Sequence, residues 1–359
     1  MIVITGASSG IGLVTARMAA ERGAKLVLAS RNERALAKLA GEINDKGGDA
    51  IYVAADVAKE ADVKKIASEA VNHYGTFDTW VNNAGVSIYG KLEEVSLEDS
   101  KQLFETNFWG LVNGSIVAAR HLRLTGGALI NIGSTLSDVA IPLQGMYSAS
   151  KHAVKGFTDA LRMELEADGA PVSVTLIKPA AIDTPYKEHA KNYLGVQPEN
   201  PPPVYSPETA ARAILHSAEH STRDVFIGGG AKVFSTMRKY APRTTDIVME
   251  NTMIDMQKTD RPDNGISREG LYESQDASLK ERGGYTGHVA ESSLYTKATL
   301  HPKLTTAAVA LGLGGLIWGL TRNNGEASRA AAPALRDENG KSASQQAGFT
   351  SPSVRDFTA

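Results

Sequence analysis

The chain has 359 residues, of which 42% are hydrophobic and 22% are charged, and this composition excludes wholesale disorder and collagen-like structure. Its 38 basic and 40 acidic residues give a net charge of −2, so there is no basic excess to bind a nucleic acid. The absence of cysteine excludes disulfides, thiolate metal sites and thiol nucleophiles, and the eight histidines show no metal-ligand spacing. We therefore expect no metal, and catalysis by hydroxyls, amines, carboxylates or a bound cofactor.

Residues 1–230 alternate short apolar runs with longer helical patterns. The runs predict strands at 2–5, 26–30, 51–55, 79–82, 128–132, 173–177 and 225–227. The helical patterns cover 11–22, 34–46, 61–74, 97–122, 146–168 and 207–220. Such alternation is typical of βαβ units, so it predicts one α/β domain with a doubly wound parallel sheet.

The remaining sequence breaks this rhythm. Residues 185–206 are rich in proline, and we expect a mobile flap over a pocket, with a plain surface loop as the alternative. Residues 231–303 read as an amphipathic and weakly structured extension that either stays loose or docks on the core. The uncharged stretch 304–321 predicts a membrane-associated helix or, alternatively, a soluble apolar helix sealing a dimer groove. The polar tail 322–359 is expected to be disordered.

A glycine-rich turn follows the first predicted strand and opens directly into a helix. It reads Thr5-Gly6-Ala7-Ser8-Ser9-Gly10-Ile11-Gly12. Glycine lets the backbone turn tightly and approach a pyrophosphate, and a helix N-terminus offers N–H groups to the anion. The turn therefore predicts a dinucleotide site, the alternative being a purely structural turn.

The end of the second predicted strand indicates which dinucleotide is bound. A site specific for NAD places an acid there to bind the ribose 2′-hydroxyl, whereas this chain has Ser30-Arg31. A guanidinium pairs with a 2′-phosphate, so Arg31 favours NADP over NAD. The alternative is that Arg31 is only a solvated surface charge.

A phenol and an amine lie four residues apart in Tyr147-Ser148-Ala149-Ser150-Lys151, on one face of a predicted helix. A nearby ammonium stabilises phenolate, which brings tyrosine towards the working range of an acid/base catalyst. Ser134 follows a predicted strand and could hydrogen-bond a substrate oxygen beside this tyrosine. Taken alone, such a Tyr/Lys pair is more often a solvated helix face.

The combined motifs resemble the short-chain dehydrogenase/reductase family over residues 1–230. They are the glycine turn, Asn82-Asn83-Ala84-Gly85, Asn107, Ser134 and Tyr147-x-x-x-Lys151, in this order. The resemblance implies a Rossmann fold with a seven-stranded parallel sheet, hydride transfer between a nicotinamide and an alcohol or ketone, and frequent homo-oligomers. It implies Tyr147 as general acid/base, Ser134 orienting the substrate, and Lys151 holding the ribose and lowering the tyrosine pKa. Asn107 would support a water chain to Lys151.

The same resemblance implies cofactor contacts along much of the domain. They are expected at Gly6, Ser8, Ser9, Gly10, Ile11, Gly12, Arg31, Asp56, Val57, Asn83, Ala84, Gly85, Tyr147, Lys151, Pro179, Ile182 and Thr184. One departure lies beside the nicotinamide: the family usually has Pro-Gly after the sixth strand, and this chain has Pro179-Ala180. Alanine fits there if its φ is negative.

These observations predict an NADP-dependent oxidoreductase acting on an alcohol or ketone of a fairly apolar substrate. The substrate pocket is expected from residues 87–92, 135–144 and 185–205. The alternatives are a catalytically silent cofactor-binding protein and a membrane-recruited scaffold. The N-terminus lacks a charged segment with a cleavage site, so we expect the catalytic domain in the cytoplasm, with membrane attachment through 304–321.

Overall fold

The computed structural model describes residues 1–263, 270–273, 279–303 and 305–306. The chain divides into two compact units, Met1–Pro302 and Lys303–Ala359. Nearly all of the second unit lies outside the described residues, so the fold below is that of the first unit.

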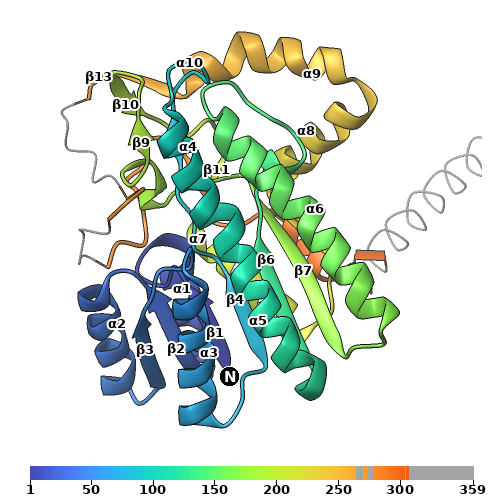
Figure 1. Cartoon of the computed structure of the whole chain (residues 1–359). Coiled ribbons are helices and arrows are strands. Elements are labelled where there is room, and N and C mark those ends of the chain that lie inside the picture. The colour runs from blue at the N-terminus through green and yellow to red at the C-terminus, as the bar shows by residue number, and fades with distance from the viewer. Residues whose placement is uncertain (264–269, 274–278, 304, 307–359) are drawn as a thin grey trace, which may run out of the picture. The chain divides into compact units, whose positions relative to one another are not determined.

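A seven-stranded parallel sheet forms the centre of this unit (Figure 1). Its strands are β1 (Ile2–Thr5), β2 (Lys25–Ser30), β3 (Asp49–Ala54), β4 (Thr79–Asn82), β6 (Gly127–Ile132), β7 (Val172–Pro179) and β12 (Asp224–Ile227), in the order β12-β7-β6-β4-β1-β2-β3. The chain moves outward from β1 through β2 to β3 and then resumes at β4 on the other side of β1. In a doubly wound sheet, ligands bind where the strand order reverses in this way. The seven predicted strands are confirmed.

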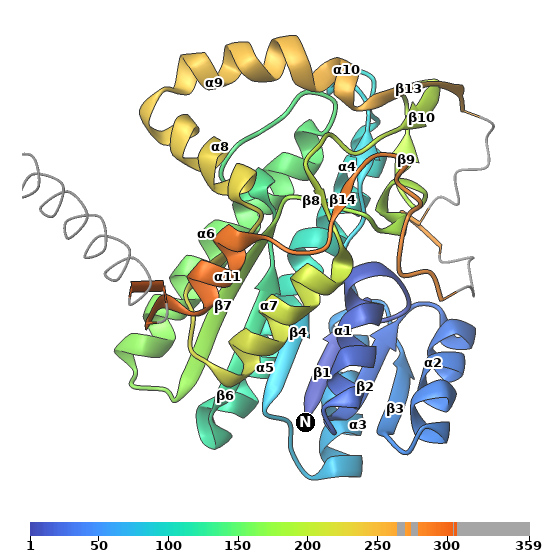
Figure 2. The ribbon, with the colours of Figure 1, turned by 180° about the vertical axis from the view of Figure 1, so that it is seen from behind.

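Both faces of the sheet are covered because successive side chains of each strand point in opposite directions. Ile4 and Leu28 belong to a core cluster on one side, and Val3 and Val27 belong to a cluster on the other. The first side is covered by α1 (Gly10–Glu21), α2 (Glu33–Asp45) and α7 (Pro207–Glu219), as Figure 2 shows. The second is covered by α3 (Glu60–Tyr74), α5 (Gly110–Thr125) and α6 (Gly145–Ala167). The predicted α/β class is confirmed.

The helix expected at residues 97–122 is present, but it is not α-helical throughout. It consists of α4 (Leu97–Phe104), a π-helical turn η1 (Glu105–Trp109) and α5. Ser96 starts α4 by accepting a hydrogen bond from the backbone N–H of Asp99 at 3.0 Å. A π-helical turn inserts one residue into a helix and commonly marks a functional site. Asn107 lies in this turn.

The segment expected as a flap is built from short elements that pair with distant parts of the chain. They are the 3-10 turn η3 (Pro185–Lys187), β9 (Lys191–Asn192), β10 (Val196–Pro198) and β11 (Val204–Tyr205). β9 pairs with β5 (Ile88–Tyr89), β10 with β13 (Lys258–Pro262), and β11 with β8 (Ala181–Ile182) and β14 (Val289–Ala290). Its mobility stays a prediction.

The extension beyond residue 230 docks on this core. It contains α8 (Gly229–Tyr240), α9 (Pro242–Val248), the π-helical turn η4 (Met249–Met253), α10 (Ile254–Met256) and α11 (Leu294–Leu300). In Figure 1, α8, α9 and α10 form an arch beyond one end of the sheet. This arch forms the first part of the extension that was expected at residues 231–303.

No helix among the described residues is long and apolar enough to cross a membrane. Of the stretch 304–321, only Thr305 and Thr306 are described, so the expected membrane segment lies almost wholly outside the described residues. The same holds for the expected tail at 322–359.

Candidate active site

The glycine turn brings β1 and the loop after β4 into close contact. Gly6 has a φ of +66°, a conformation that side chains disfavour. The side-chain amide of Asn83 donates to the carbonyls of Thr5 and Gly6 at 3.0 and 3.1 Å. A Cβ on Gly12 would lie 2.3 Å from the Gly6 carbonyl oxygen, so only glycine fits there. These contacts hold the N-terminus of α1 next to the edge of the sheet where the parallel strands end.

Ser134, Tyr147 and Lys151 meet at the same edge. Ser134 follows β6 and starts the 3-10 turn η2 (Thr135–Ser137), its hydroxyl accepting from the Leu136 N–H at 3.0 Å. Tyr147 and Lys151 lie one turn apart on α6, with the Lys151 ammonium 5.6 Å from the tyrosine ring centroid. Lys151 also donates to the Ile132 carbonyl at 2.9 Å. The Ser134 hydroxyl hydrogen-bonds to Tyr147, so the three predicted side chains form one connected group.

Burial sets the protonation of this group. It raises the pKa of Tyr147, while hydrogen bonds from Tyr186 and Ser134 act in the opposite direction. It lowers the pKa of Lys151 to about 8. Desolvation of the phenol is the largest cause, so the net pKa of Tyr147 lies above its ordinary value, and the expected lowering by Lys151 stays a prediction. The phenol is protonated at neutral pH and can donate a proton.

Asn107 lies in η1 and holds the loop after β4 in place by hydrogen bonds. Its Oδ1 accepts from the Val86 N–H at 2.8 Å, and its amide donates to the Val86 carbonyl at 2.9 Å and to the Ser150 hydroxyl at 3.3 Å. A Cβ on Gly85 would lie 3.4 Å from Asn107 Oδ1 and 3.9 Å from Lys151 Nζ. These are ordinary contact distances, so Gly85 lies beside both the asparagine and the lysine. Asn107 is buried behind the site rather than lining it.

A cavity of about 350 Å³ joins these parts. Sixteen of the seventeen expected cofactor residues line it, namely Gly6, Ser8, Ser9, Gly10, Ile11, Arg31, Asp56, Val57, Asn83, Ala84, Gly85, Tyr147, Lys151, Pro179, Ile182 and Thr184. Gly12 does not line it, since it packs against Gly6. Ser134 lines it as well. The sequence-predicted cofactor and catalytic residues are therefore brought together in space.

The substitution of alanine for the usual glycine after Pro179 costs no backbone strain. Ala180 does not have a positive φ, and its N–H donates to the Ile227 carbonyl at 3.0 Å. Pro179, Ala180 and Ala181 all line the cavity. The turn at this point is therefore compatible with a side chain.

The half of the cavity beyond Tyr147 is mainly apolar. Leu136, Val139 and Ile141 of the loop after β6 line it together with Phe234, Met249 and Met253 of the extension. Residues of the extension were not expected at the site. Their apolar spacing in the sequence is equally typical of any helix packed on a core, so no sequence signal distinguished them.

Tyr186 is a second residue that sequence reasoning missed. It follows Pro185 in η3, lines the cavity, and lies edge to face with Tyr147. Its hydroxyl lies 3.3 Å from Gln144 Oε1 and also bonds to the Tyr147 hydroxyl, so two acceptors share its one proton, and burial raises its pKa well above the ordinary value. Only its position within the expected flap pointed towards the pocket.

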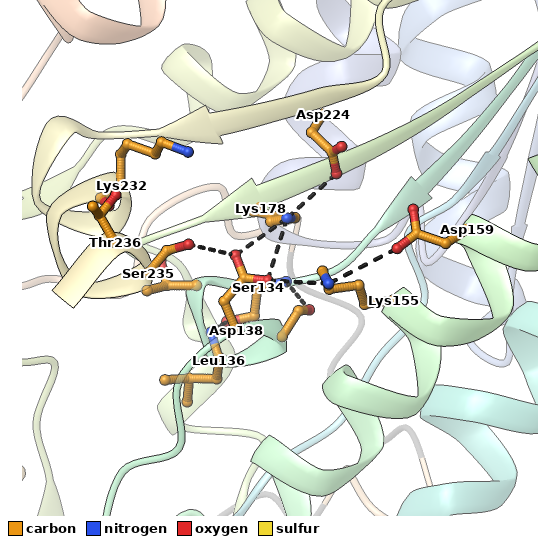
Figure 3. Close-up of polar contacts among 12 residues, drawn as sticks. Ser134, Leu136, Asp138, Lys155, Asp159, Lys178, Asp224, Lys232, Ser235 and Thr236 are labelled. Carbon is orange, nitrogen blue, oxygen red and sulfur yellow. Dashed lines mark hydrogen bonds and ion pairs between the residues drawn. The ribbon is translucent and has the colours of Figure 1, made fainter. Parts of the chain in front are cut away.

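An ion-pair cluster forms around Asp138, the residue that directly follows η2. Lys178 of β7 is buried between Asp138, at 3.2 Å, and Asp224, at 3.3 Å, as Figure 3 shows next to Ser134. Ser235 of α8 donates to the same Asp138 carboxylate at 2.9 Å. The cluster thus ties the turn that begins at Ser134 to the sheet and to the extension.

Comparison with known proteins identifies the family. A family model described as short chain dehydrogenase matches residues 1–193. The chain belongs to this family. This short-chain dehydrogenase is 50% identical over 313 residues to an uncharacterized oxidoreductase, YxnA, of Bacillus subtilis, covering 86% of this chain and 88% of the relative. It is 36% identical over 236 residues to 11-beta-hydroxysteroid dehydrogenase A of Sesamum indicum, covering 63% and 67%.

Solved structures of the family support the same assignment. A short-chain dehydrogenase/reductase of Burkholderia phymatum in complex with NAD has a TM-score of 0.58 and 26% identity, covering 73% of this chain and 97% of that one. An alcohol dehydrogenase of Thermococcus sibiricus complexed with 5-hydroxy-NADP has a TM-score of 0.56 and 27% identity, covering 63% and 94%. The chain is therefore an oxidoreductase of a family that uses nicotinamide cofactors, and the Rossmann-type sheet is shared.

Proposed function

We propose that the protein transfers a hydride between NADP(H) and an alcohol or ketone of a fairly apolar substrate, with Tyr147 as the general acid/base. One observation carries the proposal. Ser134, Tyr147 and Lys151 meet in a cavity that continues to Arg31 on one side and to an apolar wall on the other. The cavity thus connects a binding site for a phosphorylated dinucleotide with a binding site for an apolar substrate.

The residues at the dinucleotide end fit NADP. The N-terminus of α1 lies at the cavity, where a pyrophosphate would receive the backbone N–H of Ile11, since the N–H of Gly10 is donated to the Lys280 carbonyl. Arg31 lines the cavity, and its side-chain hydrogen bonds go to neutral backbone carbonyls, so its positive charge remains available to a phosphate. The solved relatives carry both NAD and an NADP derivative, so the preference for NADP rests on Arg31.

The side chains of the site can transfer the proton that accompanies the hydride. When bound, the nicotinamide supplies or accepts the hydride. In the reducing direction, the protonated Tyr147 phenol donates to the carbonyl oxygen of the substrate, and Ser134 holds the same oxygen by a hydrogen bond. Lys151 lies beside the phenol with its ammonium fixed by the Ile132 carbonyl, so it stabilises the phenolate that remains. Oxidation of an alcohol runs through the same residues in reverse.

The apolar wall defines the class of substrate. Phe234, Met249 and Met253 offer ring and thioether surface and no hydrogen-bonding group, opposite the polar set around Tyr147. Such a pocket favours a bulky apolar body with one hydroxyl or keto group. The resemblance to hydroxysteroid dehydrogenases supports including sterol-like compounds among the candidates.

A screen of alcohols and ketones, followed by nicotinamide absorbance, tests the proposal. It includes sterol-like and long-chain compounds and is run with NADP and with NAD. Tyr147→Phe keeps the ring and removes the proton, so we expect near-normal NADP binding and a turnover lower by about three orders of magnitude. Unchanged turnover of this variant would falsify the mechanism.

A further inference from the structure

Three consecutive carbonyls of the extension hold the side chain of Arg31. One guanidinium nitrogen donates to the carbonyl of Leu271 at 3.2 Å and to that of Tyr272 at 3.0 Å. The other terminal nitrogen donates to the carbonyl of Gly270. Arg31 follows β2, near the start of the chain, so this contact joins segments about 240 residues apart in sequence.

The segment 270–272 is held in place independently of Arg31. Leu271 is fully buried in a cluster with Val86, Ile88, Val95 and Leu103. The Tyr272 hydroxyl donates to Asp99 of α4 at 2.6 Å. The Gly270 N–H donates to the His189 carbonyl at 2.8 Å. Because its anchors lie on other elements, the segment positions the guanidinium rather than following it.

A second part of the extension meets the cavity at the pyrophosphate end. The Gly10 N–H, in the first turn of α1, donates to the Lys280 carbonyl at 2.9 Å. The N–H groups of Gly283 and Tyr285 donate to the Asp183 carboxylate at 3.1 and 3.0 Å. Gly270, Glu273 and Lys280 line the same cavity as Arg31. The described parts of the extension therefore form one wall of the dinucleotide site.

The three hydrogen bonds to backbone carbonyls leave the positive charge of Arg31 uncompensated. Carbonyl oxygens are neutral acceptors, whereas a carboxylate in their place would compensate the guanidinium and weaken its attraction for a phosphate. The three hydrogen bonds occupy three of the five guanidinium N–H groups, which leaves two for a ligand. They also fix a side chain that would otherwise lose conformational freedom on binding. Asp56, another cavity residue, attracts Arg31 only through its electrostatic field.

We propose that residues 270–272 are a positioning element for Arg31 and thereby determine cofactor specificity, holding the guanidinium where the 2′-phosphate of NADP binds. The inference rests on the proposed function, since it concerns the same cofactor. It assigns a role in cofactor selection to a segment that lies outside residues 1–193, the part matched by the family model.

The test displaces the segment 270–272 and leaves Arg31 itself unchanged. Leu271→Ala removes the buried anchor of the segment, and Gly270→Ala places a Cβ 3.0 Å from the His189 carbonyl, which pushes the segment away from its present position. For each full-length variant, kcat/KM and Kd are measured with NADP and with NAD. Holding a side chain ready for binding is worth about 1 kcal/mol, so we expect the NADP-to-NAD ratio to fall about five- to tenfold.

Two further variants serve as controls. Leu271→Met keeps the volume of the anchor, and Leu300→Ala makes a similar cavity in α11 of the same extension, where the side chain does not line the cofactor site. Both should leave the cofactor ratio at the wild-type value. Thermal unfolding of every variant shows whether the fold is kept. If Leu271→Ala does not fold, Gly270→Ala alone provides the test, and the reverse holds if Gly270→Ala does not fold.

The outcomes separate this inference from the proposed function. An unchanged ratio in Leu271→Ala and Gly270→Ala, combined with loss of the NADP preference in Arg31→Ala, overturns the positioning role alone. A ratio that rises in the loosened variants also overturns it, because the carbonyls would then compete with the phosphate. If the wild type shows no preference for NADP at all, the cofactor assignment itself fails.

Discussion

Tyr186 packs edge to face on Tyr147, with ring centroids 5.5 Å apart, and shares a hydrogen bond with it. This bond stabilises the phenolate of Tyr147 and so lowers its pKa against the effect of burial. In the proposed mechanism Tyr186 thus tunes the acid/base group, although it lies in the proline-rich segment rather than on α6.

Tyr186→Phe should therefore make Tyr147 a weaker acid. A hydrogen bond of about 1 kcal/mol corresponds to a rise in the Tyr147 pKa of about 0.7, so the pH dependence of alcohol oxidation should move to higher pH by that amount. The measurement is kcat/KM against pH. The matched control is Tyr74→Phe, which removes a hydroxyl bonded to Asp49 at the far edge of the sheet. A profile that does not move in Tyr186→Phe contradicts the assignment.

Lys151→Met should change stability in a pH-dependent way. Burial lowers the pKa of Lys151 to about 8, so below pH 8 the folded protein carries a buried charge that is easier to hold in the unfolded chain. The unfolded state binds more protons between about pH 8 and pH 10.5, and the stability of the wild type therefore rises relative to the variant across this window. At pH 7 the variant should be more stable by up to about 3 kcal/mol, with activity lost.

Urea unfolding of both proteins at pH 7 and pH 10 measures this difference. The gap should shrink at pH 10, where the lysine is largely neutral in the folded state. A gap that is the same at both values would show that the ammonium is not the destabilising group.

Arg31→Asp should weaken NADP far more than NAD. The carboxylate would repel the 2′-phosphate and accept from a ribose hydroxyl instead, so we expect NADP affinity to fall about a hundredfold. Fluorescence titration with each cofactor measures both constants. Arg34→Asp makes the same charge change on the exposed side of α2 and controls for the overall electrostatic field. Equal losses of NADP and NAD in Arg31→Asp would rule out phosphate recognition by this residue.

Asp138→Asn should destabilise the fold. It removes one of two carboxylates that compensate the buried ammonium of Lys178, and breaking a buried ion pair costs about 3 kcal/mol. Asp246→Asn breaks an exposed pair with Arg238 and should cost less than about 1 kcal/mol. The two free energies of unfolding are compared by urea denaturation. Similar small losses in both variants would mean that the cluster behind Ser134 adds little to stability.

The central sheet was predictable because its strands are short apolar runs buried on both faces. The strand at Thr79–Asn82, for instance, agrees with its expected bounds. β8, β11 and β14 were not predictable, since two-residue strands are defined by partners far away in sequence. The π-helical turn around Asn107 was missed for a related reason: the residues of 97–122 all suit a helix, and the inserted residue shows only in the backbone hydrogen bonds.

The chemistry of the site was predictable where a motif fixes the spacing of its residues. Tyr147 and Lys151 are one helical turn apart, so their side chains had to share a face. Tyr186, Phe234 and the carbonyls around Leu271 reach the cavity through tertiary packing, and no local pattern places them there. Backbone carbonyls are invisible to any reading of side chains, which is why the partners of Arg31 emerged only from the fold.

The hydrogen bond from Gly10 to Lys280 has a consequence for biosynthesis. The residues at the glycine turn of the proposed dinucleotide site leave the ribosome before the carbonyl that closes it, which is made 270 residues later. At the usual speed of translation, about 5–20 residues per second, the nascent domain waits on the order of 10 to 50 seconds with this wall missing. The cofactor site in its described form is thus completed late in synthesis, after the sheet that supports it has been made.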